Sequence, residues 1–138
     1  MGKYLLIDDD DIIQFIHSKV VKRFDPEGEV VTAFSVDEGI NVLQDMAPDA
    51  LPDFIFVDIS MPVKSGFNFI EELEGLDPIV HARLLARARV FILTSSVNPN
   101  DLKRSAQSNV VEGLLSKPLN PTVLEQLRKN APAHISSH

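Results

Sequence analysis

The sequence contains no cysteine among its 138 residues, so disulfide bonds and cysteine chemistry are excluded, which fits a reducing compartment. It also lacks any apolar run of the roughly 20 residues that a membrane-spanning helix needs, and its N-terminus carries no signal-peptide pattern. Positive charge is scarce: 13 Lys and Arg residues stand against 20 Asp and Glu residues, and they form no basic stripe. We therefore expect a cytoplasmic protein that neither inserts into a membrane nor binds nucleic acid directly.

Apolar residues, by contrast, are plentiful enough to build a core. Hydrophobic residues make up 44% of the chain and charged residues 24%, which is typical of a single globular domain. Internal repeats, linkers and low-complexity segments are absent. We expect one domain over residues 1–130, followed by a flexible C-terminal tail over residues 131–138.

The most informative stretch is the apolar run 54–57, which ends on Asp58 and is stopped by Pro62. The run is too short for a helix of ordinary length and too apolar for a half-exposed strand. It predicts a strand buried on both faces, as in parallel sheets covered by helices on each side. Ligands of such sheets bind outside the carboxyl ends of the strands, so Asp58 would lie at the mouth of a site.

Further strand-like segments alternate with helical patterns along the chain. The predicted strands cover residues 4–7, 29–34, 54–58, 90–93 and 113–115. The five predicted helices follow the acidic run 8–11, the capping pair Ser35 and Glu38, Gly66, the pair Asn98-Pro99 and the pair Asn120-Pro121. This alternation predicts an α/β protein with a doubly wound, flavodoxin-like parallel sheet of five strands in the order 2-1-3-4-5, with helices on both faces.

Two helical segments need separate comment. In the first helix, the apolar residues that recur at helical spacing are Ile12, Ile13, Ile16, Val20 and Phe24, so the last acids of the run 8–11 can cap this helix. Residues 75–89 are longer than the usual connection between a helix and a strand. Within them Asp77-Pro78 is a good capping pair, and the apolar residues that follow predict an extra helical turn or two.

Four of the five predicted strands end in residues suited to one reaction: Asp8-Asp9, Asp58, Thr94 and Lys117. The remaining strand is expected at the sheet edge, so the other four ends can meet in one crevice. Carboxylates gathered there would repel one another and need a hard cation, for which oxygen ligands favour Mg²⁺. A lysine and a threonine hydroxyl could bind phosphoryl oxygens, and a carboxylate can act as the nucleophile that forms an aspartyl-phosphate.

Each of these residues also has a simpler interpretation. The acidic run could cap a helix, Thr94 could cap a turn, and Lys117 could be an ordinary surface lysine. Their conjunction at the strand ends favours a site. The four histidines, which show no metal-site spacing and are expected at the surface or in the tail, are His17, His81, His134 and His138. Phe67 and Phe69 are expected to serve core and surface packing.

At this point four motifs resemble those of a known family, the receiver domains of two-component response regulators. They match in order and spacing: Leu6-Ile7-Asp8-Asp9, Val57-Asp58-Ile59-Ser60-Met61-Pro62 with Gly66, Leu93-Thr94-Ser95, and Ser116-Lys117-Pro118. The resemblance covers about residues 3–130, so no output domain is expected. Residues 92–96 and 115–119, together with the long segment 75–89, look most like those of the stand-alone, CheY-like receivers.

The resemblance implies a role for each site residue. Asp58 would be the phosphoacceptor, taking a phosphoryl group from a sensor histidine kinase or a histidine phosphotransfer protein. Asp9 and Asp58 would ligate Mg²⁺ together with the main-chain carbonyl of Ser60, while Asp8 would support the metal through water. Thr94 and Lys117 would contact the phosphoryl group. The protein would then signal to a downstream protein, whose identity the sequence leaves open. It would not be an enzyme beyond its own phosphotransfer and autodephosphorylation.

Two positions depart from the family pattern. Leu114 stands three residues before the lysine, where the family usually carries a Tyr or Phe whose ring moves on activation. Lys64-Ser65 stands before Gly66, where an Asp often directly precedes the glycine.

Two other functions remain open at this stage. A haloacid-dehalogenase-like phosphatase would use Asp8-Asp9-Asp10 as its first motif, with Thr94 and Lys117 as its second and third. That family needs a further acidic motif after the lysine, where only Glu125 follows, and it leaves Asp58 without a role. The other alternative is a receiver-like interaction module used without phosphorylation, which Leu114 keeps open.

Overall fold

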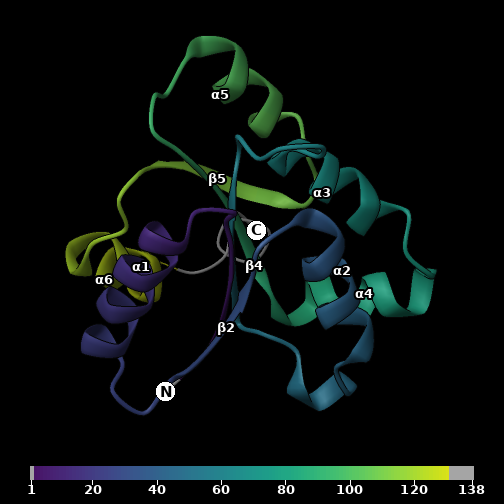
Figure 1. Cartoon of the computed structure of the whole chain (residues 1–138). Helices are drawn as coiled ribbons and strands as arrows, with labels where there is room; N and C mark the ends of the chain where they lie inside the picture. Colours follow the sequence, from purple (N-terminus) through teal and green to yellow (C-terminus); the bar gives the residue numbers. More distant parts are fainter. Residues whose placement is uncertain (1, 131–138) are drawn as a thin grey trace.

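Five parallel strands form one sheet in the computed structural model, which describes residues 2–130 (Figure 1). The strand order is β2-β1-β3-β4-β5, which confirms the predicted flavodoxin-like topology. The strands are β1 (Lys3–Ile7), β2 (Glu29–Ala33), β3 (Phe54–Asp58), β4 (Arg89–Thr94) and β5 (Val111–Ser116). All four strand pairings are parallel, so the carboxyl ends of the strands lie at one edge of the sheet.

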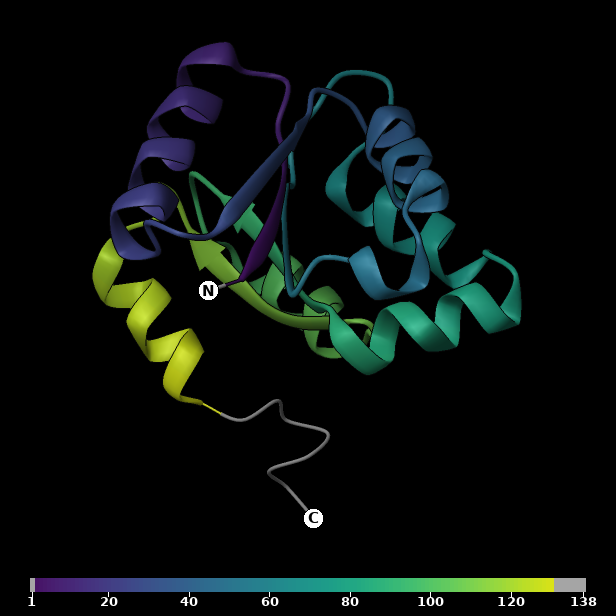
Figure 2. The same ribbon diagram turned by 90° about the horizontal axis from the view of Figure 1, so that it is seen from below.

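Helices cover both faces of this sheet. They are α1 (Asp11–Phe24), α2 (Val36–Asp45), α3 (Gly66–Glu74), α4 (Pro78–Arg87), α5 (Pro99–Ala106) and α6 (Pro121–Lys129), with a short 3₁₀ helix η1 (Pro48–Ala50). Helices α1 and α6 pack together on one face, and α2 and α3 pack together on the other (Figure 2). No helix within residues 2–130 is both long and apolar enough to cross a bilayer.

Side-chain caps fix where these helices begin. Ser35 accepts a hydrogen bond from the N–H of Glu38, whose carboxylate in turn accepts from the N–H of Phe34, so the predicted capping pair is confirmed. Asn98 and Asn120 cap α5 and α6 as predicted. Ser65 caps α3 in the same way, so it meets a capping requirement at the position where the family pattern often has Asp.

The segment 75–89 differs from its prediction. Instead of an extra turn or two it forms the ten-residue helix α4, so residues 2–130 contain six α-helices rather than the predicted five. Asp77 caps the helix as expected, by accepting from the N–H of Ile79. Tertiary contacts explain the additional length: Leu84 is buried in the core, and Arg87 binds the carboxylate of Asp53.

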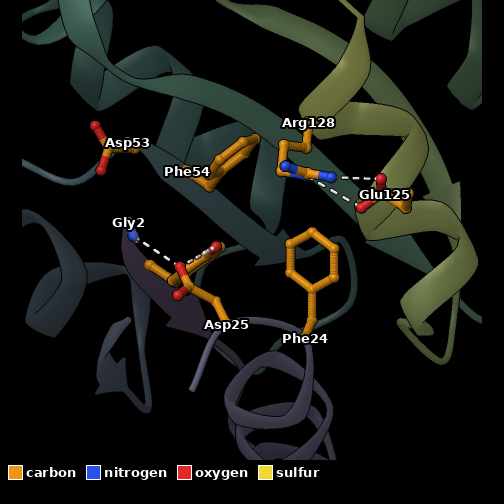
Figure 3. A pocket seen from close by; sticks show the side chains of 8 residues that line it. Gly2, Phe24, Asp25, Asp53, Phe54, Glu125 and Arg128 are labelled. Carbon is orange, nitrogen blue, oxygen red and sulfur yellow. Dashed lines mark hydrogen bonds and ion pairs between the residues drawn. The ribbon is translucent and has the colours of Figure 1, made fainter. Parts of the chain in front are cut away.

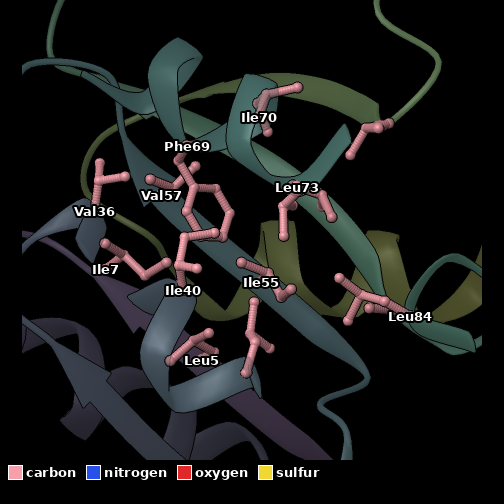
Figure 4. Close-up of a cluster of buried hydrophobic side chains, with 14 of the residues drawn as sticks. Leu5, Ile7, Val36, Ile40, Ile55, Val57, Phe69, Ile70, Leu73 and Leu84 are labelled. Atoms are coloured by element: carbon pink, nitrogen blue, oxygen red, sulfur yellow. The ribbon is translucent and has the colours of Figure 1, made fainter. Parts of the chain in front are cut away.

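The core consists of one apolar cluster on each face of the sheet. Alternate residues of each central strand point to opposite faces, so Ile55 and Val57 enter the cluster under α2 and α3, whereas Phe56 enters the cluster under α1 and α6. Figure 4 shows the first cluster, in which Phe69 lies against side chains from the strands. Phe67 and Phe69 are both buried core residues.

The face of helix α1 that packs against the sheet is not the face that carries most of its isoleucines. The buried residues of its inner face are Gln14, His17 and Val21, whereas 70% of Ile12 and 40% of Ile16 are exposed. The helical spacing correctly predicted the helix, but Ile12 and Ile16 do not lie on its buried face. It was wrong to place His17 at the surface. Gln14 Nε2 and His17 Nε2 both have hydrogen-bond partners in the interior, which offsets part of the free-energy cost of burying these side chains, whereas Gln14 Oε1 is buried without a partner among the described residues.

The other histidines and the chain ends complete the comparison. His81 is half-buried, so its surface prediction is only partly correct. His134 and His138 belong to segment 131–138, which lies outside the described residues. The division into a domain over residues 1–130 and a C-terminal tail stays a prediction.

Candidate functional site

The predicted site residues lie together at the carboxyl edge of the sheet. Asp58 is the last residue of β3 and Thr94 the last of β4, while Asp8 and Lys117 directly follow β1 and β5. The strand register aligns these ends, because Ile7 pairs with Val57, Asp58 with Leu93, and Thr94 with Ser116. Carboxylate oxygens of Asp8, Asp9 and Asp58 lie within 4.8 Å of one another, so the predicted convergence of the three acids is confirmed.

Lys117 reaches directly into this acidic cluster. Its Nζ lies 2.7 Å from Oδ2 of Asp8 and 3.0 Å from Oδ1 of Asp58. All three side chains are largely buried. In such surroundings the ion pairs offset part of the cost of removing the charges from water, and loss of one partner leaves an unpaired buried charge. Lys117 is therefore part of this buried cluster and not an ordinary surface lysine.

The electrostatics of Asp58 and Lys117 follow from burial and from this contact. Burial raises the pKa of the Asp58 carboxyl and the charge of Asp8 raises it further, while the Lys117 hydrogen bond and a backbone hydrogen bond from Ser60 partly offset these effects. Burial lowers the pKa of Lys117, but its hydrogen bonds to Asp8 and Asp58 outweigh this, and the net pKa is raised. At neutral pH Lys117 is thus a cation held against the carboxylates.

Thr94 is buried beside the acids, but its hydroxyl is engaged locally. It donates to the backbone oxygen of Ser96 and accepts from the N–H of Ser96, both at 3.1 Å. In this structure Thr94 thus closes a turn, as its simpler interpretation proposed. The carbonyl of Thr94 accepts from the N–H of Lys117 at 2.7 Å, which joins the ends of β4 and β5 at the site.

The donor set fits the expected metal ion. Three carboxylates supply only oxygen ligands, which suits Mg²⁺, and the exposed Asp9 leaves the cluster accessible from solvent. A ligand role for the Ser60 main-chain carbonyl stays a prediction.

Gly66 allows the loop after β3 to close over Asp58. A Cβ atom at this position would lie 2.7 Å from the carbonyl oxygen of Asp58 and 3.1 Å from Cα of Ile59. Only glycine permits so close an approach, so any other residue would displace the backbone that carries Asp58. The glycine thus has a direct steric role in shaping the site.

Two buried polar residues of α1 support the site and were not predicted. Gln14 donates from Nε2 to the carbonyl oxygens of Leu6, Asp8 and Ala33 at 3.0, 3.1 and 2.9 Å. His17 accepts at Nε2 from the N–H of Leu119 at 3.2 Å. The signal available in the sequence was their spacing, because Gln14, His17 and Val21 share one helical face.

Leu114 lies within β5 opposite Ile92 of β4. Its side chain is partly buried and packs against the cluster under α2 and α3. It therefore contacts the strand that ends at Thr94.

A hollow of about 510 Å³ lies far from these residues, at the amino-terminal edge of the sheet (Figure 3). Its acids already have partners. Asp25 accepts from the N–H of Gly2 and the hydroxyl of Tyr4, Asp53 accepts from the N–H of Lys3, and Glu125 pairs with Arg128. The bonds of Asp25 and Asp53 tie the start of β1 to the chain after α1 and before β3, and the Glu125–Arg128 pair lies within α6, so the charged groups of the hollow already serve structural contacts.

The sequence model of the response regulator receiver domain matches residues 4–129. The chain belongs to this family. A nitrate/nitrite response regulator protein homolog of Haemophilus influenzae is 32% identical over 96% of this chain and 58% of its own length. Two uncharacterized response regulatory proteins of Staphylococcus epidermidis are 27% and 26% identical over 92% of the chain and 45% of their own length. The receiver domain thus spans about half the length of the curated relatives it matches.

Solved structures of receivers have the same fold. A two-component response regulator from Cytophaga hutchinsonii has a TM-score of 0.82 and 29% identity, covering 91% of this chain and 92% of its own. A response regulator receiver protein from Dyadobacter fermentans has a TM-score of 0.80 and 27% identity, covering 92% and 94%. The chemotaxis protein CheY4 of Vibrio cholerae has a TM-score of 0.74 and 27% identity, covering 94% and 98%.

Family membership and geometry together favour a signalling domain. The receiver pattern gives Asp58 a role inside the acidic cluster, whereas the haloacid-dehalogenase alternative leaves it without one. The chain is accordingly a CheY-like receiver domain of two-component signalling.

Proposed function

We propose that this receiver accepts a phosphoryl group on Asp58 from a phosphohistidine of a sensor histidine kinase or a histidine phosphotransfer protein. A carboxylate oxygen of Asp58 attacks phosphorus, an O–P bond forms, the N–P bond breaks, and the leaving imidazole takes up a proton. The observation that carries this proposal is the placement of Lys117 Nζ 3.0 Å from Asp58 Oδ1, next to two further acids. Catalysis would come from positioning and charge neutralisation.

The residues of the site divide this work. Lys117 would move from the carboxylates to a phosphoryl oxygen, because its ammonium is the buried cation nearest to the new negative charge. Thr94 would exchange its turn contact with Ser96 for a phosphoryl oxygen. Asp9 and Asp58 would hold Mg²⁺ with the Ser60 carbonyl, and Asp8 would support it through water. The ion would offset the negative charge gathered around Asp58.

The exposed apolar side of α1 supports docking of the phosphoryl donor. Ile12, Phe15 and Ile16 are 70%, 63% and 40% exposed, and α1 begins two residues after Asp9. Apolar side chains so close to the acidic cluster are suited to a helical partner that delivers a histidine to Asp58. The buried polar face of α1 is what leaves these residues facing outward.

The output would be a change in protein contacts rather than turnover of a substrate. The only reactions expected of this chain are its own phosphotransfer and autodephosphorylation. The downstream partner would be another protein, and the cytoplasmic location stays a prediction.

The proposal is tested by mass spectrometry of the intact protein after treatment with acetyl phosphate and Mg²⁺. The expected result is one added phosphoryl group, which is lost in Asp58→Ala and retained in Asp11→Asn, a matched change at an acid outside the cluster. Labelling that persists in Asp58→Ala would contradict the assignment. A wild-type protein that no donor labels, including purified histidine kinases, would favour an unphosphorylated interaction module. Steady hydrolysis of p-nitrophenyl phosphate would favour the phosphatase.

A further inference from the structure

His17 is buried between α1 and the turn that follows β5. Only 1% of its surface is exposed, and its Nε2 accepts a hydrogen bond from the N–H of Leu119, a residue 102 positions later in the chain. Leu119 is itself buried in the cluster under α1 and α6, and it stands two residues after Lys117. The contact therefore ties the chain immediately after the lysine to the inner face of α1.

The helix that carries His17 is held firmly at the same edge of the sheet. Gln14, one turn earlier on the same face, donates to carbonyl oxygens at the ends of β1 and β2. One of these is the carbonyl of Asp8 itself. These bonds fix the position of helix α1 relative to the acids. The bond from Leu119 to His17 then fixes the chain after Lys117 relative to the same helix.

The segment from Lys117 to Leu119 is held at three points. The N–H of Lys117 donates to the carbonyl of Thr94, its Nζ contacts Asp8 and Asp58, and the N–H of Leu119 donates to His17. If His17 were apolar, the N–H of Leu119 would be buried without this acceptor, and the segment would have to shift to find another. A shift of about 1 Å at Lys117 is enough to disturb the contacts of its ammonium with Asp8 and Asp58.

We infer that His17 is a positioning residue, which holds the backbone after Lys117 at the depth where the ammonium reaches Asp8 and Asp58. This inference rests on the proposed function, in which Lys117 neutralises a phosphoryl oxygen on Asp58. The role requires a neutral imidazole, with its proton on Nδ1 and its lone pair on Nε2. Burial and the nearby charge of Lys117 both lower the pKa of His17, against a smaller opposing effect of Asp8, which keeps the ring neutral near pH 7.

The test compares three variants with the wild type. His17→Leu removes the acceptor, and His17→Gln keeps an acceptor oxygen at similar reach. Val21→Ala is the matched control, because Val21 is fully buried one turn further along the same face and contacts neither acid nor lysine through a hydrogen bond. The rate of Asp58 labelling by acetyl phosphate and the affinity for Mg²⁺ are measured well below the melting temperature of every variant.

The expected result is a labelling rate about tenfold lower in His17→Leu, with wild-type rates in Val21→Ala and substantial recovery in His17→Gln. The affinity for Mg²⁺ should not fall in His17→Leu, because a loosened Lys117 repels the ion less. A purely structural defect would instead lower labelling and Mg²⁺ affinity together, and that result would overturn the inference. A wild-type labelling rate in His17→Leu would overturn it as well.

These outcomes are distinct from failure of the proposed function. If the wild-type protein takes no label at all, the proposed function is wrong, and the positioning contact is then decided by ¹⁵N NMR. A scalar coupling between the Leu119 amide nitrogen and His17 Nε2, with a displaced Lys117 ammonium resonance in His17→Leu, would support the inference. An unchanged Lys117 resonance would overturn it.

Discussion

Lys117 Nζ lies 2.7 Å from Oδ2 of Asp8, although 109 residues separate them in the chain. The same ammonium contacts Asp58, so the buried acids are paired with a cation that the chain itself supplies. Asp9 is exposed and makes no ion pair with this lysine. A divalent ion entering the cluster would therefore compete with Lys117 for the negative charge of Asp8 and Asp58, and it would gain Asp9 as a ligand.

Mg²⁺ should stabilise the folded protein, because only the folded chain brings the three acids together. At a hundredfold excess over its dissociation constant the gain in unfolding free energy is about 2.7 kcal/mol. Asp9→Ala should remove most of this gain, whereas Asp11→Asn, at an acid outside the cluster, should keep it. Thermal melts with and without Mg²⁺ measure the difference. A melting temperature indifferent to Mg²⁺ in the wild type would contradict the site.

Lys117→Gln should strengthen Mg²⁺ binding while slowing phosphorylation. Removal of the ammonium leaves Asp8 and Asp58 unpaired in the metal-free protein and removes a positive charge that repels the ion. We expect about a tenfold gain in Mg²⁺ affinity, equivalent to about 1.4 kcal/mol. Isothermal titration measures it, and Lys129→Gln on the exposed end of α6 is the control. Weaker Mg²⁺ binding in Lys117→Gln would show that the lysine supports the metal site rather than competing with it.

Asp58→Asn should stabilise the metal-free protein at neutral pH. Because the pKa of Asp58 is raised in the folded state, the folded protein is most stable where this carboxyl is protonated. That advantage is complete below the unfolded pKa of about 3.9 and is lost as pH rises through the folded pKa. The amide introduced by Asp58→Asn carries no charge, so this variant avoids the loss of stability that follows from ionising the buried carboxyl. Asp8 still pairs with Lys117 in this variant. Denaturant titrations should show a higher midpoint than wild type at pH 7 and no difference at pH 3. A lower midpoint at pH 7 would refute the prediction.

The strand ends of this fold could be predicted because their physical causes are visible in the sequence. A strand buried on both faces must be apolar throughout, so the runs ending at Asp8, Asp58 and Thr94 stand out. Parallel crossovers then force all of these ends to one edge of the sheet. The assembly of the site follows from these two constraints. The pairing of Lys117 with Asp8 does not follow from them, because the position of the Lys117 ammonium depends on the conformation of the turn after β5 and of its own flexible side chain.

The orientation of α1 and the length of α4 could not be predicted for a related reason. Hydropathy favours burial of Ile12 and Ile16, but Gln14 and His17 occupy the inner face, where Gln14 Nε2 donates to backbone carbonyls at strand ends and His17 Nε2 accepts from the N–H of Leu119. Helix α4 is stabilised by the contact of Arg87 with Asp53, which lies far away in the sequence. Both features depend on partners that a local pattern does not contain.

The folded protein should lose stability on acidification through His17. Because burial and Lys117 lower the pKa of this histidine, the folded state keeps it neutral while the unfolded chain becomes protonated. The stability is fully present above the unfolded pKa of about 6.5 and falls as pH decreases toward the lower folded pKa. Unfolding titrations from pH 7.5 to 5.5 should show this fall in the wild type and a smaller one in His17→Gln. An identical slope in both proteins would contradict the prediction.

Helix α5 follows Thr94 and buries few of its side chains. Ser105 is its one buried residue among those described, while Leu102 and the preceding Val97 are 47% and 41% exposed. The guanidinium of Arg104 lies 4.1 Å from the ring centroid of Phe67 and links α5 to α3. Few apolar contacts therefore resist a displacement of residues 95–108.

Phosphorylation should accordingly change the segment after Thr94 while Leu114 stays in place. If Thr94 turns toward a phosphoryl oxygen, it releases Ser96 and with it the chain that leads to α5. Leu114 lacks an aromatic ring that could swing between exposed and buried positions, and it already packs against the core. Binding shifts such an equilibrium only through differential affinity for its two states, so some element must move. NMR spectra with and without beryllofluoride, a phosphoryl mimic, should show large shifts over residues 95–108 and little reorientation of Leu114. A rotamer change at Leu114 with an unmoved 95–108 segment would refute this route for the signal.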